Sequence, residues 1–192
     1  MVKFTSKQKL NLGEFFMNNK VFLRKTCSVY ASDIHLATMT FPFINKEIEN
    51  GAVVKPILEK NISDSIKKII NNMGINEEAK DKISQVDWNQ TNIYKIKNTL
   101  NNIERNFSKN TRIHFLVAGS NLFIEKVNKL IDLWVKINLD KMEKEDVIVN
   151  VINCYNFNEN DKIDNIIQNH EYILKTTGIE EICDVEKLKK AN

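Results

Sequence analysis

The pattern of apolar and polar positions is clearest from Arg112 to Gly119, where the chain is RIHFLVAG. A short and nearly uninterrupted apolar run of this kind is typical of a strand that is buried on both faces of a sheet. Gly119 permits a sharp turn, and Ser120 or Asn121 can cap the amphipathic helix that follows. The stretch therefore predicts a strand, a tight turn and a helix, which together make half of a βαβ unit.

Strand-like and helix-like patterns alternate along most of the chain. Strands are expected at 21–30, 52–58, 83–88, 112–119 and 147–155, with a sixth, edge strand at 172–176. Helices are expected at 33–50, 62–73, 89–106, 122–137 and 161–170. Strands that alternate with helices predict the α/β class, here a three-layer sandwich with a mostly parallel central sheet and helices on both faces.

The two prolines and the chain length refine this picture. Pro42 lies inside the first predicted helix and should kink or break it. Pro56 removes a ladder donor, so the second strand ends near it or lies where that donor is not needed. A chain of 192 residues without a linker or repeat predicts a single domain over 1–192. We expect an arm or short helix at 1–20, a core at 21–176, and a helix or tail at 177–192.

Charge and composition argue against several classes of function. The net charge is only +3 and charges of both signs are interspersed, so the basic stripe of a nucleic-acid-binding adaptor is missing. No apolar run approaches the roughly 18 residues of a membrane span, and residues 1–12 lack the apolar core of a signal peptide. A cytoplasmic protein is expected. The three cysteines and three histidines show no CxxC pair and no metal-ligand spacing, so we expect free thiols and no metal site.

The glycines bear directly on nucleotide chemistry. All five are widely separated, so neither GxxxxGK[ST] nor GxGxxG occurs, and no NTPase activity is expected. The esterase motif GxSxG is missing as well. One alternative from the enzyme class stays open: a degenerate nucleotide-binding enzyme whose backbone N–H groups at Gly119 to Asn121 cradle an anion. A turn glycine and a helix cap explain the same residues without a ligand.

Ligands of parallel α/β sheets bind beyond the carboxyl ends of the strands. Aromatic and polar residues follow several of the predicted strands, so they would meet at this edge. The candidate ligand-binding residues are Tyr30, Asp33, Trp88, Ser120, Asn121, Tyr155 and Asn156. Aromatic rings beside a few polar groups are typical of a small-molecule site. The structural alternatives are that Trp88 and Tyr155 seal the rim of the core and that Asp33 has a capping role.

Four segments of the chain resemble the MEDS family, whose members are DcmR-like sensory domains. These segments are CSVY at 27–30, the helix ending PFINKEIENG, the strand AVVKPIL, and NVINCYNF followed by IIQNH. Cys27 and Tyr30 match a Cys and a Tyr of the family's first strand. Tyr155 and His170 match a Tyr and a His near the family's end.

The resemblance implies a RecA-like or KaiC-like core that has lost its phosphate loop and serves as a sensor. The chain would be a non-catalytic module that binds a small molecule or a regulatory protein partner and acts on a transcriptional or kinase pathway. No cofactor is implied, membrane and nucleic-acid partners are not expected, and a homodimer is compatible with the sequence. Thr26, Asn153 and Asn156 stand where the family often has His, Cys and Asp. If these positions contact the ligand in the family, this chain is expected to bind a different ligand or none.

Overall fold

Six strands pair in the order β4-β5-β6-β3-β7-β8 to form the central sheet of the computed structural model. The structure describes residues 16–17, 20–72, 74, 76–160 and 163–182. The strands are β3 (Leu23–Tyr30), β4 (Val53–Leu58), β5 (Arg112–Gly119), β6 (Ile148–Asn156), β7 (Tyr172–Lys175) and β8 (Gly178–Glu181). In this order all neighbours from β4 to β7 are parallel, and β8 is antiparallel to β7. The predicted strand at 112–119 is β5, in the interior of the sheet.

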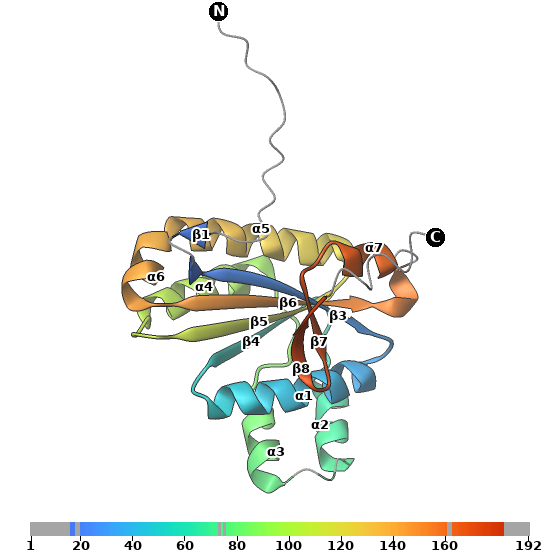
Figure 1. Cartoon of the computed structure of the whole chain (residues 1–192). Coiled ribbons are helices and arrows are strands. Elements are labelled where there is room, and N and C mark those ends of the chain that lie inside the picture. Colours follow the sequence, from blue (N-terminus) through green and yellow to red (C-terminus); the bar gives the residue numbers. More distant parts are fainter. Residues whose placement is uncertain (1–15, 18–19, 73, 75, 161–162, 183–192) are drawn as a thin grey trace, which may run out of the picture.

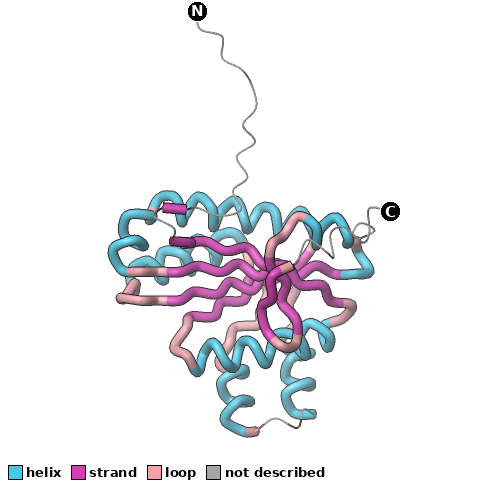
Figure 2. The backbone as a smooth tube through the Cα atoms, in the orientation of Figure 1, coloured by secondary structure: helices cyan, strands magenta, loops and turns pink. Residues whose placement is uncertain are grey.

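Helices cover both faces of this sheet (Figure 1). One layer contains α1 (Asp33–Glu49), α2 (Ser63–Asn72) and α3 (Glu77–Ser84). The other contains α4 (Ile93–Arg105), α5 (Asn121–Ile137), α6 (Leu139–Glu145) and α7 (Ile163–Gln168). A separate two-stranded ladder joins β1 (Phe16–Met17) to β2 (Lys20–Val21). The sheet lies between the two helical layers (Figure 2), so the predicted three-layer α/β fold with a mostly parallel sheet is confirmed.

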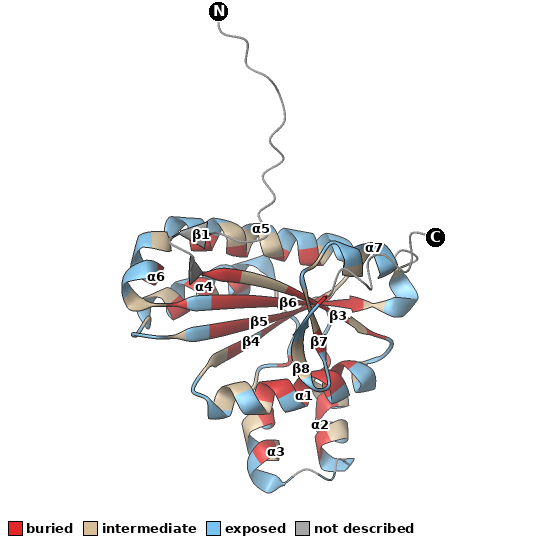
Figure 3. Ribbon diagram, viewed as in Figure 1, coloured by how far each residue is buried: buried red, intermediate tan, exposed pale blue. Residues whose placement is uncertain are grey.

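Alternate residues of each central strand enter two separate apolar layers. Phe115 and Val117 of β5 pack on the side of α5, whereas Leu116 packs on the side of α1 and α2. In β6, Val151 and Ile152 divide between the two layers in the same way. Buried residues follow the central strands along most of their length (Figure 3). Because successive side chains of a strand point to opposite faces, the position of a residue in this alternation decides which helical layer it contacts.

The strand predicted at 83–88 is wrong, because α3 ends within this stretch and a loop continues to α4. Asn76 caps α3 by accepting a backbone hydrogen bond at 2.8 Å, so the polar segment before Ile83 is helical. Trp88 is buried, donates its indole N–H to the carbonyl of Ile83 at 3.0 Å, and has its ring 5.7 Å from that of Phe41. The apolar spacing of this stretch fits a helix end and a turn as well as a strand.

Both prolines are accommodated inside their elements. Helix α1 continues through Pro42, which is exposed, so the predicted break is absent. Pro56 lies within β4, an edge strand that pairs with β5. The N–H of Glu59 donates across this pair at 2.9 Å, whereas the N–H of Leu58 points away from β5. By the same alternation Pro56 faces the open edge, where no ladder donor is needed.

The C-terminal part of the sheet differs from the prediction. The strand at 172–176 is β7, but it is not the edge, since β8 continues the sheet as a hairpin. Gly178 has a φ of +126°, which a glycine adopts readily in a tight turn. The hairpin extends toward α1 (Figure 1). The predicted arm at 1–20 and the helix or tail at 177–192 fall largely outside the described residues.

Candidate functional site

Three of the predicted site residues meet at the carboxyl edge of the sheet. Tyr30, Asp33 and Asn156 line a cavity of about 70 Å³, which we call the carboxyl-edge cavity. Burial, assisted by the Cys154 thiol and nearby carboxylates, raises the pKa of the Tyr30 phenol to about 12, so this group stays neutral. The cavity has the volume of about two water molecules. This volume is well below the roughly 300–1,000 Å³ that is typical of small-molecule sites.

The other aromatic and amide candidates lie elsewhere. Trp88 is enclosed in the core beside α1. Tyr155 packs in the apolar layer on the side of α5, whereas Tyr30 packs in the layer on the side of α1. Asn121 is exposed and donates a side-chain hydrogen bond to Asn160. The structure therefore does not bring the predicted aromatic residues together at one site.

The predicted anion cradle at the start of α5 holds a carboxylate of the chain itself. Glu59, which follows β4, accepts the backbone N–H of Ser120 at 2.5 Å and the hydroxyl of Ser120 at 2.9 Å. A β-carbon added to Gly119 would lie 2.6 Å from the Glu59 β-carbon and 2.9 Å from the Phe123 ring. A carboxylate at a helix N-terminus is favoured by the helix dipole. A phosphate could bind there only after displacing Glu59.

Tyr155 and His170, two of the residues that carry the family resemblance, are in contact. Their ring centroids are 5.9 Å apart at 71°. The His170 Nδ1 lies 2.8 Å from the carbonyl oxygen of Ile166, so Nδ1 carries the proton and donates. Burial lowers the pKa of His170 and raises the pKa of Tyr155, so both rings are neutral near pH 7. The pair belongs to the apolar layer beside α7.

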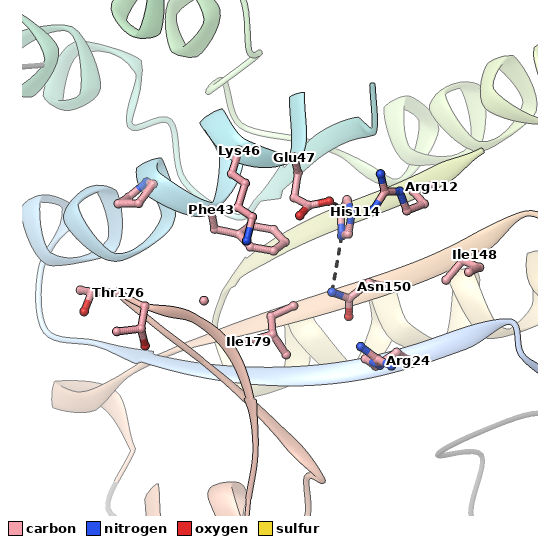
Figure 4. Close-up of a pocket in the computed structure, with 13 residues that line it drawn as sticks. Arg24, Phe43, Lys46, Glu47, Arg112, His114, Ile148, Asn150, Thr176 and Ile179 are labelled. Carbon is pink, nitrogen blue, oxygen red and sulfur yellow. Dashed lines mark hydrogen bonds and ion pairs between the residues drawn. The ribbon is translucent and has the colours of Figure 1, made fainter. Parts of the chain in front are cut away.

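A larger pocket opens at the other end of the strands, on the side of α1. It has a volume of about 460 Å³ and lies between the C-terminal half of α1, the start of β3, β5 and β6, and the β7–β8 hairpin (Figure 4). We call it the α1–hairpin pocket. Its lining is Arg24, Pro42, Phe43, Lys46, Glu47, Arg112, His114, Ile148, Asn150 and Thr176 to Ile179. None of the seven predicted site residues lines it.

The floor of the α1–hairpin pocket is a polar row across the sheet. The strand register pairs Asn150 of β6 with His114 of β5 on one side and with Arg24 of β3 on the other. Asn150 and His114 are buried, in strands that are otherwise strongly apolar. The available sequence signal was the presence of polar residues inside two buried apolar runs, namely His114 in β5 and both Asn150 and Asn153 in β6. Without the register, that signal could not show that the residues are neighbours.

Hydrogen bonds extend this row in both directions. The Thr26 hydroxyl donates to the Asn150 Oδ1 at 3.0 Å, and the Asn150 Nδ2 lies 3.5 Å from the His114 Nδ1. An amide nitrogen can only donate, so Nδ1 of His114 accepts and Nε2 carries the proton. That Nε2 lies 3.0 Å from Glu47 Oε2 of α1. Burial lowers the pKa of His114, against the effect of Glu47 and together with Arg112 and Arg24.

Three basic side chains surround this row. Arg24 lies with its guanidinium carbon 4.4 Å from the centroid of the Tyr172 ring. Arg112 donates to the backbone carbonyl of Asn50 at 3.4 Å. Lys46 is exposed on α1 and points toward the pocket (Figure 4). Within the described part of the chain, none of the three forms an ion pair with a carboxylate.

Comparison with known proteins gives no family. No protein-family model matches the sequence, and no curated protein sequence matches it. Among solved structures, the ATPase domain of a helicase is similar with a TM-score of 0.45 and 11% identity, over 78% of this chain and 67% of that chain. At this level of similarity no activity transfers to this chain. Over the described residues, no helix is long and apolar enough to cross a membrane. The same residues contain no cluster of His, Cys, Asp or Glu that fits a metal ion.

Proposed function

We propose that this chain is a non-catalytic sensory module that binds a small molecule in the α1–hairpin pocket. The volume of that pocket, about 460 Å³, is the observation that carries the proposal. Small-molecule sites typically measure about 300–1,000 Å³ and combine apolar walls with a few polar groups. The α1–hairpin pocket has both, whereas the carboxyl-edge cavity, at about 70 Å³, falls well below that range.

The chemistry of the lining favours binding over catalysis. The described lining includes no serine or cysteine that a base could activate. His114 and Glu47 are the titratable pair of the pocket, and both are engaged with each other. The Asn150 side chain holds the other nitrogen of His114. These contacts join the polar residues of the floor to one another.

The resemblance to the MEDS family supports a sensory role. In this proposal the output is a transcriptional or kinase pathway, reached through a partner protein. The pocket joins parts that are distant in sequence, since α1 forms one wall and the β7–β8 hairpin another. The hairpin is held to β3 by a short register of two residue pairs and by the Ser28 hydroxyl, 3.4 Å from the Leu174 carbonyl. A ligand that contacts both walls would change how they are held together, and a partner could detect this change.

Co-purification tests the proposal. The full chain is purified from cells under mild conditions, and native mass spectrometry measures any bound small molecule. Ile148→Trp fills the α1–hairpin pocket, whereas Thr99→Trp is a matched control in a separate depression beside α4. We expect the wild type and Thr99→Trp to carry the ligand and Ile148→Trp to lose it.

The same experiment separates the two ends of the sheet. Asn156→Trp obstructs the carboxyl-edge cavity and leaves the α1–hairpin pocket unchanged. If Asn156→Trp loses the ligand and Ile148→Trp retains it fully, the ligand binds at the carboxyl edge and the proposed site is wrong. A wild-type protein that carries no ligand from any growth condition would count against a small-molecule sensor.

A further inference from the structure

We infer that the α1–hairpin pocket recognises a small organic acid, whose anionic group lies between Arg24 and Arg112 and whose apolar part meets the walls. This inference rests on the proposed function, because it names the ligand class of the same pocket.

The lining of the α1–hairpin pocket carries more positive than negative side chains. Three cations line the pocket, and the one lining carboxylate, Glu47, already faces His114. On the opposite face of the sheet, by contrast, Lys25 has its Nζ 2.8 Å from Asp132. The cations of the pocket have no such partner among the described residues. An anion that enters this partly enclosed space gains charge-assisted hydrogen bonds that water matches less well.

The two arginines are placed to share one anion. Arg24 pairs in register with Asn150, and Arg112 pairs with Ile148, so the arginines flank β6 from both neighbouring strands. A cation–π contact with the Tyr172 ring helps to hold the Arg24 guanidinium at this border of the pocket. Guanidinium groups bind carboxylate and phosphate with two parallel hydrogen bonds, which a lysine cannot do. The anionic group would therefore lie above the start of β6.

The remaining surface suits an organic body rather than an inorganic ion. Phe43 and Pro42 of α1 form one apolar wall, and Ile148 and Ile179 form others. The polar atoms of the floor are largely used by one another, as in the contact between Asn150 and His114. An inorganic anion would leave the apolar walls in water. A compound with an acid at one end and a compact apolar body at the other fits both parts.

Four probes of similar size test the inference: benzoate, phenyl phosphate, benzyl alcohol and benzylamine. Isothermal titration calorimetry at low salt measures their binding to the full chain. We expect benzoate or phenyl phosphate to bind at least about tenfold more tightly than the alcohol and the amine. The difference between benzoate and phenyl phosphate identifies which acid the pocket prefers.

Variants locate the anion. Arg112→Gln and Arg24→Gln should each weaken binding of the acid by about tenfold or more. Lys55→Gln, a cation in the depression beside α4, should change nothing. Arg112 is exposed at the start of β5, so its replacement should leave the fold intact. If Arg24→Gln does not fold, the binding measured for Arg112→Gln tests the inference. The melting temperature of each variant checks this.

Two results would overturn the inference and differ in what they say of the proposed function. If neutral or cationic probes bind as well as the acids and Ile148→Trp abolishes this binding, the pocket is a ligand site but not an acid site. If the acids bind but neither arginine variant weakens their binding, the arginines do not recognise the anion and the inference fails, while the proposed function stands. If no probe binds and the wild type carries no ligand from cells, the inference and the proposed function both fail.

Discussion

Replacing Ser120 with alanine removes two interactions at once, and the structure allows them to be separated. The Ser120 hydroxyl caps α5 by accepting the Phe123 N–H at 3.3 Å, and it donates to Glu59 at 2.9 Å. Loss of a cap costs about 1 kcal/mol. A hydrogen bond to a charged group contributes about 1.5–3 kcal/mol, and because both residues are half-buried we take the lower end, about 1.5 kcal/mol. Ser120→Ala should therefore lower the free energy of unfolding by about 2.5 kcal/mol.

The control removes a cap alone. Ser32 caps α1 by accepting the His35 N–H at 3.2 Å, so Ser32→Ala should cost about 1 kcal/mol. Urea unfolding is followed by the fluorescence of the two tryptophans, both of which are buried. In a Glu59→Ala background, the extra cost of Ser120→Ala should largely disappear, which a double-mutant cycle measures. If Ser120→Ala costs no more than Ser32→Ala, the carboxylate does not stabilise the start of α5 and the reasoning fails.

Three further predictions follow from burial and packing. Val117→Asp places an unpaired carboxylate in the core and should abolish cooperative unfolding, whereas Ile137→Asp, at a position 71% exposed, should change stability by less than about 0.5 kcal/mol; equal effects would contradict the assigned core. Gly119→Ala should cost about 1–3 kcal/mol because its β-carbon collides with Glu59, while Gly74→Ala, with nothing within 4 Å, should cost nothing by collision; urea midpoints compare them. Burial lowers the pKa of His114 and His170, so the unfolded chain binds protons that the native state refuses; stability should fall as the pH drops below about 6.5, by at most about 1.4 kcal/mol per pH unit for each histidine. His114→Gln should reduce this slope in pH-dependent urea titrations, and a stability that rises as the pH falls from about 7.5 to about 5.5 would refute the assignment.

The parts of the fold that could be predicted are those where the local sequence pattern fits only one type of secondary structure. The runs that became β5 and β6 are strongly apolar, and each is preceded or followed by a long amphipathic segment, so strands between helices are the only arrangement that buries them. The stretch at 83–88 is shorter, and its spacing is shared by a helix end and a strand. Packing of Ile83 and Trp88 against α1 selects the helix end and loop at 83–88, and the local sequence does not predict this packing.

The candidate site was harder to predict for a related reason. Choosing the carboxyl edge relies on a general property of parallel α/β sheets, but the alternation along β3 and β6 puts Tyr30 and Tyr155 in different layers. The Glu59 carboxylate then occupies the predicted anion cradle. Both outcomes depend on strand register, which determines the neighbours of each side chain across strands. A single sequence predicts the strands but does not specify that register.

The polar floor of the α1–hairpin pocket shows why register matters for function. Burying a polar group costs free energy unless it is hydrogen-bonded, and an apolar row would fill the same layer at no such cost. The chain instead has Asn150 and His114 side by side in two neighbouring interior strands, where the Thr26 hydroxyl donates to Asn150 and Glu47 Oε2 lies 3.0 Å from His114 Nε2. Their contacts fix the orientation of one another, so stability alone does not account for choosing them over valine or leucine. The floor is polar, and the arginines at its border have no carboxylate partner among the described residues. A ligand that needs such a floor explains it better, and sites of this kind are where local sequence rules are expected to be broken.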